Sequence, residues 1–157
     1  MIKKWGYRFM NDIIICPIED KFIDGILTIS LLSFPITWSK ESFESELDNN
    51  FARYLVALQG DVVVGFGGMW IIFDEAHITN IAVHPEYRGY GIGSSLLEGL
   101  MAICRLEMVL SITLEVRKSN LIAQRLYIKY GFLQEGIRKA YYENNKEDAI
   151  IMWNRNI

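Results

Sequence analysis

Cysteine, proline and histidine are scarce in this chain of 157 residues, which contains two, three and two of them. Cys16 and Cys104 form no C-x-x-C pair and each lies in an apolar stretch, so the sequence predicts neither a disulfide framework nor a zinc site. His77 and His84 have no third ligand at metal spacing, and we treat both as ordinary polar residues with no metal predicted. This use of cysteine fits a reducing cytoplasm.

Long apolar runs and clusters of basic residues are also missing. No segment reaches the roughly 18 uninterrupted apolar residues that a membrane-spanning helix needs, and residues 1–10 are not followed by the apolar run of a signal peptide. The net charge is -3 and the 16 Lys and Arg residues are scattered, which argues against a nucleic-acid-binding face. We therefore expect a cytoplasmic protein with neither a membrane nor a nucleic acid as partner.

The residues that are present make a sizeable core. Apolar residues account for 51% of the chain and charged residues for 22%, which excludes a disordered or fibrous protein. No repeat, low-complexity tract or Gly/Ser/Pro-rich linker divides the sequence. We expect a single domain over residues 1–157, in which residues 1–10 are an unassigned N-terminal segment.

Hydrophobic periodicity predicts a mixed α/β sheet protein. The order is strand, two helices, three antiparallel strands, helix, strand, helix and two closing strands. The expected strands are 13–18, 54–58, 62–73, 76–83, 111–116, 132–138 and 149–153. The expected helices are 19–33, a short helix capped by Ser39, 94–108, and a helix that begins at Asn120 and stops at Gly131.

A glycine-rich turn between the strand at 76–83 and the next helix is the most informative stretch. Such a turn presents backbone N–H groups at the positive end of the helix dipole, and Gly91 and Gly93 carry no side chain that would block a phosphate. Arg88 beside them favours an anion site over a merely tight connection. The chain has no Gly-Lys pair for a Walker A loop, and Gly89, Gly91 and Gly93 do not fit the dinucleotide spacing G-x-G-x-x-G.

The pattern R-x-x-G-x-G at Arg88, Gly91 and Gly93 resembles the acetyl-CoA motif of the GNAT N-acetyltransferases. The resemblance extends over about residues 13–152. Its motifs are most specific to the RimI-type subgroup, which acetylates the N-terminal alanine of a small-subunit ribosomal protein. The other segments that carry it are Phe34-Pro35, Trp38-Ser39, Leu114-Glu115-Val116-Arg117, Ser119-Asn120, Ala123, Leu126-Tyr127, Tyr130-Gly131-Phe132, Tyr141-Tyr142 and residues 147–152.

This resemblance implies the GNAT acyl-CoA N-acyltransferase fold, a central and mostly antiparallel sheet flanked by about four helices, with acetyl-CoA as co-substrate. It implies that Glu115 is the base for the amine, through water, and that Tyr127 is the acid for the departing thiolate. The cofactor-binding residues that it implies are Ile81, Ala82, Val83, Arg88, Gly89, Tyr90, Gly91, Ile92, Gly93, Ser94 and Asn120. The residues that it places against a substrate peptide are Phe34, Trp38, Tyr141 and Tyr142.

The chemistry suits an N-terminal amine. An α-amine has a pKa of about 7.7 to 8.0 and is roughly one tenth neutral at pH 7, whereas less than about a thousandth of a lysine amine is neutral. The resemblance therefore implies direct transfer in a ternary complex to a protein N-terminus, most simply that of a ribosomal protein. A monomer or weak dimer is expected.

Structural interpretations and rival functions remain open at this point. Glu115 could be a solvated strand-end charge paired with Arg117, and Tyr127 could be a core aromatic residue. Tyr141 and Tyr142 could be strand-end aromatics. The rival functions are acetylation of a small amine such as a polyamine or aminosugar, which a closed acidic pocket would favour, and a non-catalytic acyl-CoA-binding module. A dinucleotide oxidoreductase is more remote.

Overall fold

The computed structural model describes residues 12–157, which form two compact units. Within the described range, unit 1 contains residues 12–69 and Asn80–Leu100, and unit 2 contains Trp70–Thr79 and Met101–Ile157. The N-terminal segment expected at residues 1–10 lies outside the described residues.

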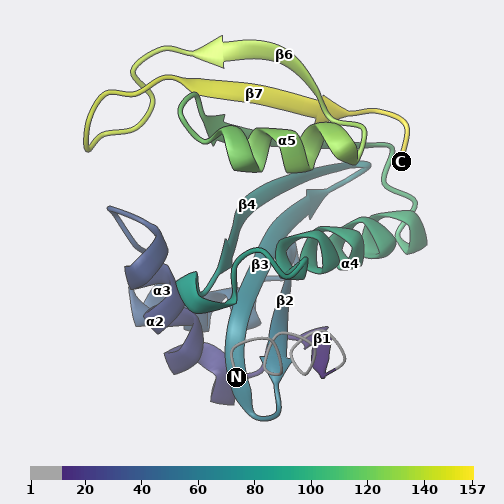
Figure 1. Cartoon of the computed structure of the whole chain (residues 1–157). Helices are drawn as coiled ribbons and strands as arrows, with labels where there is room; N and C mark the ends of the chain where they lie inside the picture. The colour runs from purple at the N-terminus through teal and green to yellow at the C-terminus, as the bar shows by residue number, and fades with distance from the viewer. Residues whose placement is uncertain (1–11) are drawn as a thin grey trace. The chain divides into compact units, whose positions relative to one another are not determined.

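Seven strands form a mixed and mostly antiparallel sheet, as the sequence predicts (Figure 1). Strand β4 pairs in parallel with β5, whereas the pairs β1–β2, β5–β7 and β6–β7 are antiparallel. In sheet order, the strands are β1 (Ile13–Pro17), β2 (Ala52–Gln59), β3 (Val62–Ile72), β4 (Glu75–Val83), β5 (Ser111–Arg117), β7 (Ala149–Asn154) and β6 (Leu133–Arg138).

Four α-helices lie among the described residues: α2 (Ile23–Ser33), α3 (Lys40–Leu47), α4 (Ile92–Leu106) and α5 (Leu121–Lys129). Two short 3-10 helices, η1 (Asp20–Phe22) and η2 (Pro85–Tyr87), precede α2 and α4. The predicted helix at 19–33 is thus a 3-10 turn followed by α2. Helix α4 begins at Ile92, two residues earlier than predicted, because the carbonyl of Gly91 already accepts the N–H of Ser95.

The core of unit 1 joins α2 and α3 to strands β2 and β3. Apolar residues at helical spacing bury one face of α2, and the α3 residue Phe43 packs edge-on against Phe66 of β3 at 5.8 Å between ring centroids. Gly25 lowers helix propensity, but a Cβ atom there would lie 2.8 Å from the side chain of Val63. The glycine therefore allows α2 to approach β3 closely. The buried members of this core are Phe22, Ile23, Ile26, Ile29, Phe43, Tyr54, Val56, Leu58, Phe66 and Ala82.

In unit 2, strand β5 separates an apolar face from a polar one. Ile112, Leu114 and Val116 are buried, and the residues between them carry the side chains that matter for the site. Because successive residues of a strand point to opposite faces, Thr113, Glu115 and Arg117 share one side. The Thr113 hydroxyl donates to the carbonyl of Met152 on β7 at 3.1 Å.

The local helix signals in the sequence are confirmed in both units. The Oγ of Ser39 accepts the N–H of Ser42 at 3.2 Å, and the Oδ1 of Asn120 accepts the N–H of Ala123 at 3.1 Å. Gly131 has a φ of +91°, the left-handed conformation that ends α5. Each cap therefore fixes where its helix begins or ends.

Both cysteines are free thiols. Cys104 is buried on α4, and burial raises its pKa to about 11. Cys16 is half-buried on β1, and burial followed by the charge of Glu19 raises its pKa as well. Between residues 12 and 157, no helix is long and apolar enough to cross a membrane.

Candidate active site

The glycine turn (residues 88–93) lies in unit 1, where it joins η2 to α4. Gly89 and Gly91 have φ values of +84° and +80°, which side-chain-bearing residues rarely adopt. A Cβ atom at either position would meet nothing within 4 Å, so the backbone there faces open space. The first amides of a helix have no partner within it, so the N–H groups of Ile92, Gly93 and Ser94 are suited to an anion.

Several polar contacts hold the glycine turn in place. The Nε of exposed Arg88 donates to the carbonyl of Val83 at 3.0 Å, and its Nη2 donates to the Oγ of Ser33 at 3.4 Å. Tyr87 donates its hydroxyl hydrogen to Gln59 on β2 at 2.9 Å. The Nδ1 of His84 accepts the N–H of Glu86 and so caps η2. The turn is therefore braced against β4, α2 and β2.

The other predicted cofactor residues of unit 1 differ in what they expose. Ala82 is buried at the end of β4 between the half-buried Ile81 and Val83. Ile92 is only 4% exposed and packs inward, which leaves its backbone N–H as the group that a ligand could use. Tyr90 is 39% exposed at the surface of the turn.

Glu115 lies in unit 2, and the structure contradicts the alternative that it is a solvated strand-end charge. Its side chain is 11% exposed and is therefore not a solvated charge. Its Oε2 lies 2.5 Å from the Nε2 of His77, and its Oε1 accepts from the Nε of Arg138 at 3.2 Å. Arg117, its partner in that alternative interpretation, pairs with Glu147 instead. The carboxylate is thus held from β4 and from β6.

These contacts lower the pKa of Glu115 below its ordinary value. The hydrogen bond from His77 is the largest cause; burial opposes it, and the charges of His77 and Arg138 reinforce it. Glu115 is therefore a carboxylate at neutral pH.

The absence of a third ligand at metal spacing predicts an ordinary polar role for His77, but the fold brings it to Glu115 across 38 positions of sequence. The parallel pairing of β4 with β5 sets His77 opposite Thr113, two residues before Glu115 on the same face. Across residues 12–157, no group of three or more His, Cys, Asp or Glu side chains is placed to hold a metal ion.

Tyr127 combines a core position with an available hydroxyl group. Its ring is buried on α5 against Phe132, with 5.7 Å between the centroids, and burial raises its pKa to about 12. Its hydroxyl makes no hydrogen bond within residues 12–157, and no fully buried side-chain polar atom in that range lacks a partner. The hydroxyl oxygen of Tyr127 therefore retains some solvent contact.

Tyr142 lies in the connection between β6 and β7, after the strand end, and couples electrostatically to both predicted catalytic residues. Burial raises the pKa of Tyr142 to about 12; the Arg117 charge opposes this, and the charges of Tyr141, Glu115 and Glu147 add to it. Tyr142 in turn raises the pKa of Tyr127. Tyr142 is therefore within electrostatic reach of Tyr127 and of Glu115 in unit 2.

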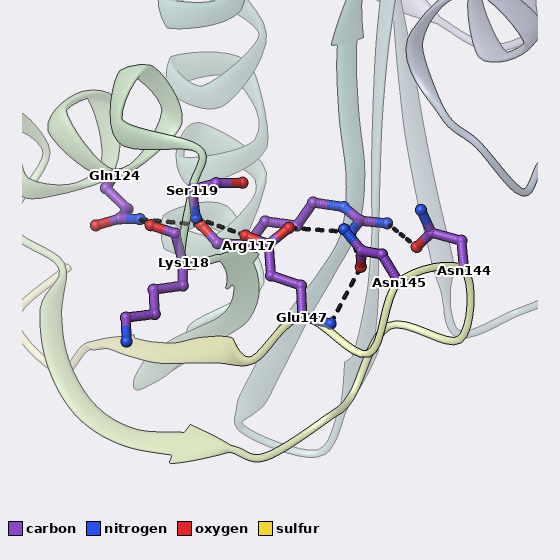
Figure 2. A network of polar contacts seen from close by, with 7 residues as sticks. All are labelled: Arg117, Lys118, Ser119, Gln124, Asn144, Asn145 and Glu147. Atoms are coloured by element: carbon purple, nitrogen blue, oxygen red, sulfur yellow. Dashed lines mark hydrogen bonds and ion pairs between the residues drawn. The ribbon is translucent and has the colours of Figure 1, made fainter.

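A polar network fixes the connection that carries Tyr142, as Figure 2 shows. Arg117 donates to Asn144, Asn145 and Glu147, and Glu147 also accepts the N–H of Ser119 at 2.6 Å. Hydrogen bonding from the Ser119 side chain, followed by that from its backbone N–H, lowers the pKa of Glu147 to about 2. We call Arg117, Ser119, Asn144, Asn145 and Glu147 the Arg117 network.

The four predicted peptide-binding residues fall into two separate pairs. Tyr141 is 46% exposed and meets Tyr142 edge-on at 5.1 Å in unit 2. Phe34 and Trp38 are partly buried against the core of unit 1, where Trp38 lies 5.4 Å from Phe43. The structure thus gives Phe34 and Trp38 a packing role.

Residues 23–132, more than half of the chain, match the model of the acetyltransferase (GNAT) family. The chain belongs to this family. It is similar to the [ribosomal protein bS18]-alanine N-acetyltransferase of Escherichia coli (strain K12), with 37% identity over 122 residues, 76% of this chain and 80% of that protein. A Bacillus subtilis (strain 168) relative, to which the same activity is provisionally given, is 46% identical over 132 residues, 83% of this chain and 87% of its own.

Solved structures confirm the expected fold. The crystal structure of the ribosomal-protein-S18-alanine N-acetyltransferase from Escherichia coli matches with a TM-score of 0.83 and 32% identity, over 90% of this chain and 92% of that chain. Ard1 from Thermoplasma volcanium matches with a TM-score of 0.84 and 28% identity, over 91% and 97% of the two chains.

Proposed function

We propose that the chain is an acetyl-CoA-dependent N-terminal acetyltransferase of RimI type, with the N-terminal alanine of ribosomal protein bS18 as its substrate. The observation that carries the substrate is the 37% identity, over 122 residues, to the Escherichia coli protein that is named for this reaction. A bacterial ribosomal protein as substrate also agrees with a cytoplasmic location.

The glycine turn is the group of residues that we assign to the diphosphate of acetyl-CoA. Open space at Gly89 and Gly91 and the first amides of α4 fit such an anion, and Arg88 supplies a positive charge. We assign Ile81, Ala82, Val83, Tyr90 and Asn120 to the rest of the cofactor. Asn120 already caps α5 through Oδ1, so its Nδ2 is the atom left to donate to the pantetheine arm.

The reaction that we assign to unit 2 is direct aminolysis of the thioester. The neutral α-amine attacks the carbonyl carbon, the new C–N bond forms, and the C–S bond breaks. Glu115 assists removal of the amine proton, and Tyr127 donates a proton to the departing thiolate. The raised pKa of Tyr127 keeps the phenol protonated at neutral pH.

The pairing of two carboxylates in unit 2, Glu115 and Glu147, favours a peptide over a polyamine. Glu115 is neutralised by Arg138 and hydrogen-bonded by His77, and Glu147 is paired with Arg117. Neither carboxylate is left unpaired to attract a polycation. Tyr141 and Tyr142 offer aromatic surface that suits the backbone and small side chains of a peptide terminus.

The test is mass spectrometry of amines incubated with acetyl-CoA and the protein. The panel contains a peptide with the N-terminal sequence of bS18, the same peptide blocked at its α-amine and carrying one lysine, spermidine, and an aminosugar. We expect one acetyl group on the first peptide only. Turnover of spermidine or the aminosugar alone would favour the small-amine enzyme, and acetyl-CoA binding without any turnover would favour the non-catalytic module.

A thermal-protection assay separates the remaining alternative. Acetyl-CoA should raise the unfolding temperature in a concentration-dependent manner, because a ligand that binds only the folded state stabilises it. NAD at the same concentrations should leave that temperature unchanged. Protection by NAD alone would contradict the assignment of the glycine turn.

A further inference from the structure

Both carboxylate oxygens of Glu115 already accept hydrogen bonds. Oε2 is engaged by the Nε2 of His77 at 2.5 Å and Oε1 by the Nε of Arg138 at 3.2 Å. Hydrogen bonds and positive charge that favour the ionised form weaken a carboxylate as a proton acceptor. An α-ammonium group with a pKa of about 7.7 to 8.0 therefore has little tendency to give its proton to Glu115.

His77 has the features of a better acceptor. A carboxylate only accepts hydrogen bonds, so the Nε2 of a neutral His77 carries the hydrogen that points to Glu115, and Nδ1 then has the free lone pair. No residue between 12 and 157 forms a hydrogen bond with Nδ1. The side chain of His77 is 40% exposed, compared with 11% for Glu115. A proton on Nδ1 can therefore leave to solvent.

We propose that His77 is the proton acceptor of the reaction and that Glu115 orients it, as the carboxylate does in a carboxylate–histidine pair. This proposal rests on the proposed function, because it takes the substrate to be an amine that arrives protonated. Nδ1 receives one proton from the α-ammonium group, directly or through one water, which leaves a neutral amine and an imidazolium paired with the Glu115 carboxylate. The imidazolium returns this proton to solvent, and the neutral amine then attacks the thioester. As the C–S bond breaks, Nδ1 takes up the second N–H proton and Tyr127 protonates the thiolate, after which the imidazolium proton returns to Tyr127 through solvent.

The charges around the pair favour this direction of transfer. The Glu115 carboxylate on β5 stabilises an imidazolium at 2.5 Å, whereas Arg138 on β6 contacts the other oxygen of Glu115. Tyr142 from the β6–β7 connection is within electrostatic reach of Glu115, and Glu75 lies two residues before His77 on the same strand. The carboxylate in contact with the ring favours the transfer, and the charge of Arg138 on the far oxygen partly opposes it.

A pair of substitutions separates proton transfer from positioning. His77→Gln places an amide nitrogen near the position of Nε2 and can keep the hydrogen bond to Glu115, but it has no group that takes up a proton. His77→Ala removes both. We expect kcat with the bS18 peptide to fall at least about tenfold in both variants, with the Kd for acetyl-CoA within about twofold of the parent value.

Wild-type kcat in His77→Gln, together with a loss in His77→Ala, would overturn the proposal and make His77 a positioning residue. Circular dichroism melting of both variants identifies a loss that is due to misfolding. If His77→Ala fails to fold, His77→Gln alone decides the question.

Added imidazole tests proton transfer directly, because it would not restore activity if His77 had only a structural role. It should restore activity of His77→Ala in proportion to the free-base fraction of imidazole as pH is varied, and should leave Glu115→Gln and the parent protein unchanged. Equal activation of all three proteins by imidazole would count against His77.

Failure of the His77 proposal can be distinguished from failure of the proposed function. All ratios are taken relative to the parent protein on whichever amine of the panel it acetylates. If only a small amine is acetylated, the substrate assignment fails, and the His77→Gln ratio on that amine still decides the proton acceptor.

Discussion

The guanidinium carbon of Arg117 lies 3.9 Å from the centroid of the Tyr142 ring, so the cation covers one face of the aromatic side chain. The same guanidinium donates to three residues of the β6–β7 connection: Asn144, Asn145 and Glu147. Only a planar group with several N–H donors can stack and reach all of these acceptors together. Arg117 therefore sets the position of Tyr142.

We expect Arg117→Lys to raise the KM for the bS18 peptide by about threefold to tenfold, because a lysine keeps the charge but loses the stacked fork of donors. The kcat value should change by less than about twofold. Arg155→Lys is the matched control, since Arg155 lies 4.1 Å over Trp153 and pairs with Glu135 in the same unit. Steady-state kinetics with varied peptide measures both. An equal rise in KM from Arg155→Lys would show that the effect on peptide binding does not depend on the position of Tyr142.

Glu115→Gln keeps the shape of the side chain and removes its charge, and we expect kcat to fall at least about tenfold with an unchanged Kd for acetyl-CoA. The amide oxygen can still accept the Nε2–H of His77, but the neutral amide no longer stabilises a positive imidazole. Glu98→Gln on the exposed side of α4 serves as control and should leave kcat unchanged. Turnover by Glu115→Gln at the parent rate would exclude Glu115 from the chemistry.

Tyr127→Phe removes one hydroxyl group from a ring that stays packed against Phe132. We expect kcat to fall by about tenfold, while the thermal unfolding midpoint stays close to that of the parent protein. Because the pKa of Tyr127 is raised to about 12, its ionisation should not reduce the parent rate below about pH 10. Tyr130→Phe near the end of the same helix is the control. A parent-like rate in Tyr127→Phe would leave Tyr127 with a packing role only.

Gly91→Ala tests the glycine turn. Its φ of +80° strains any residue with a Cβ atom, so we expect a loss of about 1 kcal/mol in unfolding free energy and a weaker Kd for acetyl-CoA. Gly60→Ala imposes the same kind of strain in the β2–β3 turn, with a φ of +59° and open space around the Cβ position. It should reduce stability alone. Calorimetric titration with acetyl-CoA distinguishes the two, and equal losses of affinity would contradict the assignment.

Acid should loosen the Arg117 network. The pKa of Glu147 is about 2 in the folded protein, below the ordinary value of about 4.3 for an unfolded chain. Its contribution to stability is therefore complete above about pH 4.3 and is lost as pH falls from there through about 2. Urea unfolding at pH 7, 4, 3 and 2 should show a smaller acid-induced loss in Glu147→Gln than in the parent protein. Parallel losses in the two proteins would show that Glu147 is not linked to folding.

Local signals in the sequence were sufficient to predict most of the fold. The caps at Ser39 and Asn120 and the stop at Gly131 each depend on contacts within a few residues, and all three are confirmed. The alternation of buried and polar residues in β5 likewise gave the strand its correct bounds to within one residue. Errors of one or two residues at element ends arise where a short-range bond, such as Gly91 to Ser95, extends a helix.

Contacts between distant segments could not be predicted in this way. The pairing of Glu115 with His77 and Arg138 depends on which strands neighbour β5, and that order brings together residues 38 and 23 positions away. The sequence therefore offered nearby Arg117 as the partner. The one sequence signal for this contact is that His77 interrupts the apolar pattern of β4. That signal does not specify which residue His77 contacts.

The state of the two thiols has a consequence for a protein that we propose to handle a thioester. Transacylation onto a cysteine requires the thiolate, and burial keeps both Cys16 and Cys104 protonated at neutral pH. Cys104 is also wholly shielded from solvent by the packing of α4. Self-acylation by acetyl-CoA should therefore be slower at these two thiols than at an ordinary exposed cysteine, and a covalent adduct found by mass spectrometry is to be sought first on some other kind of side chain.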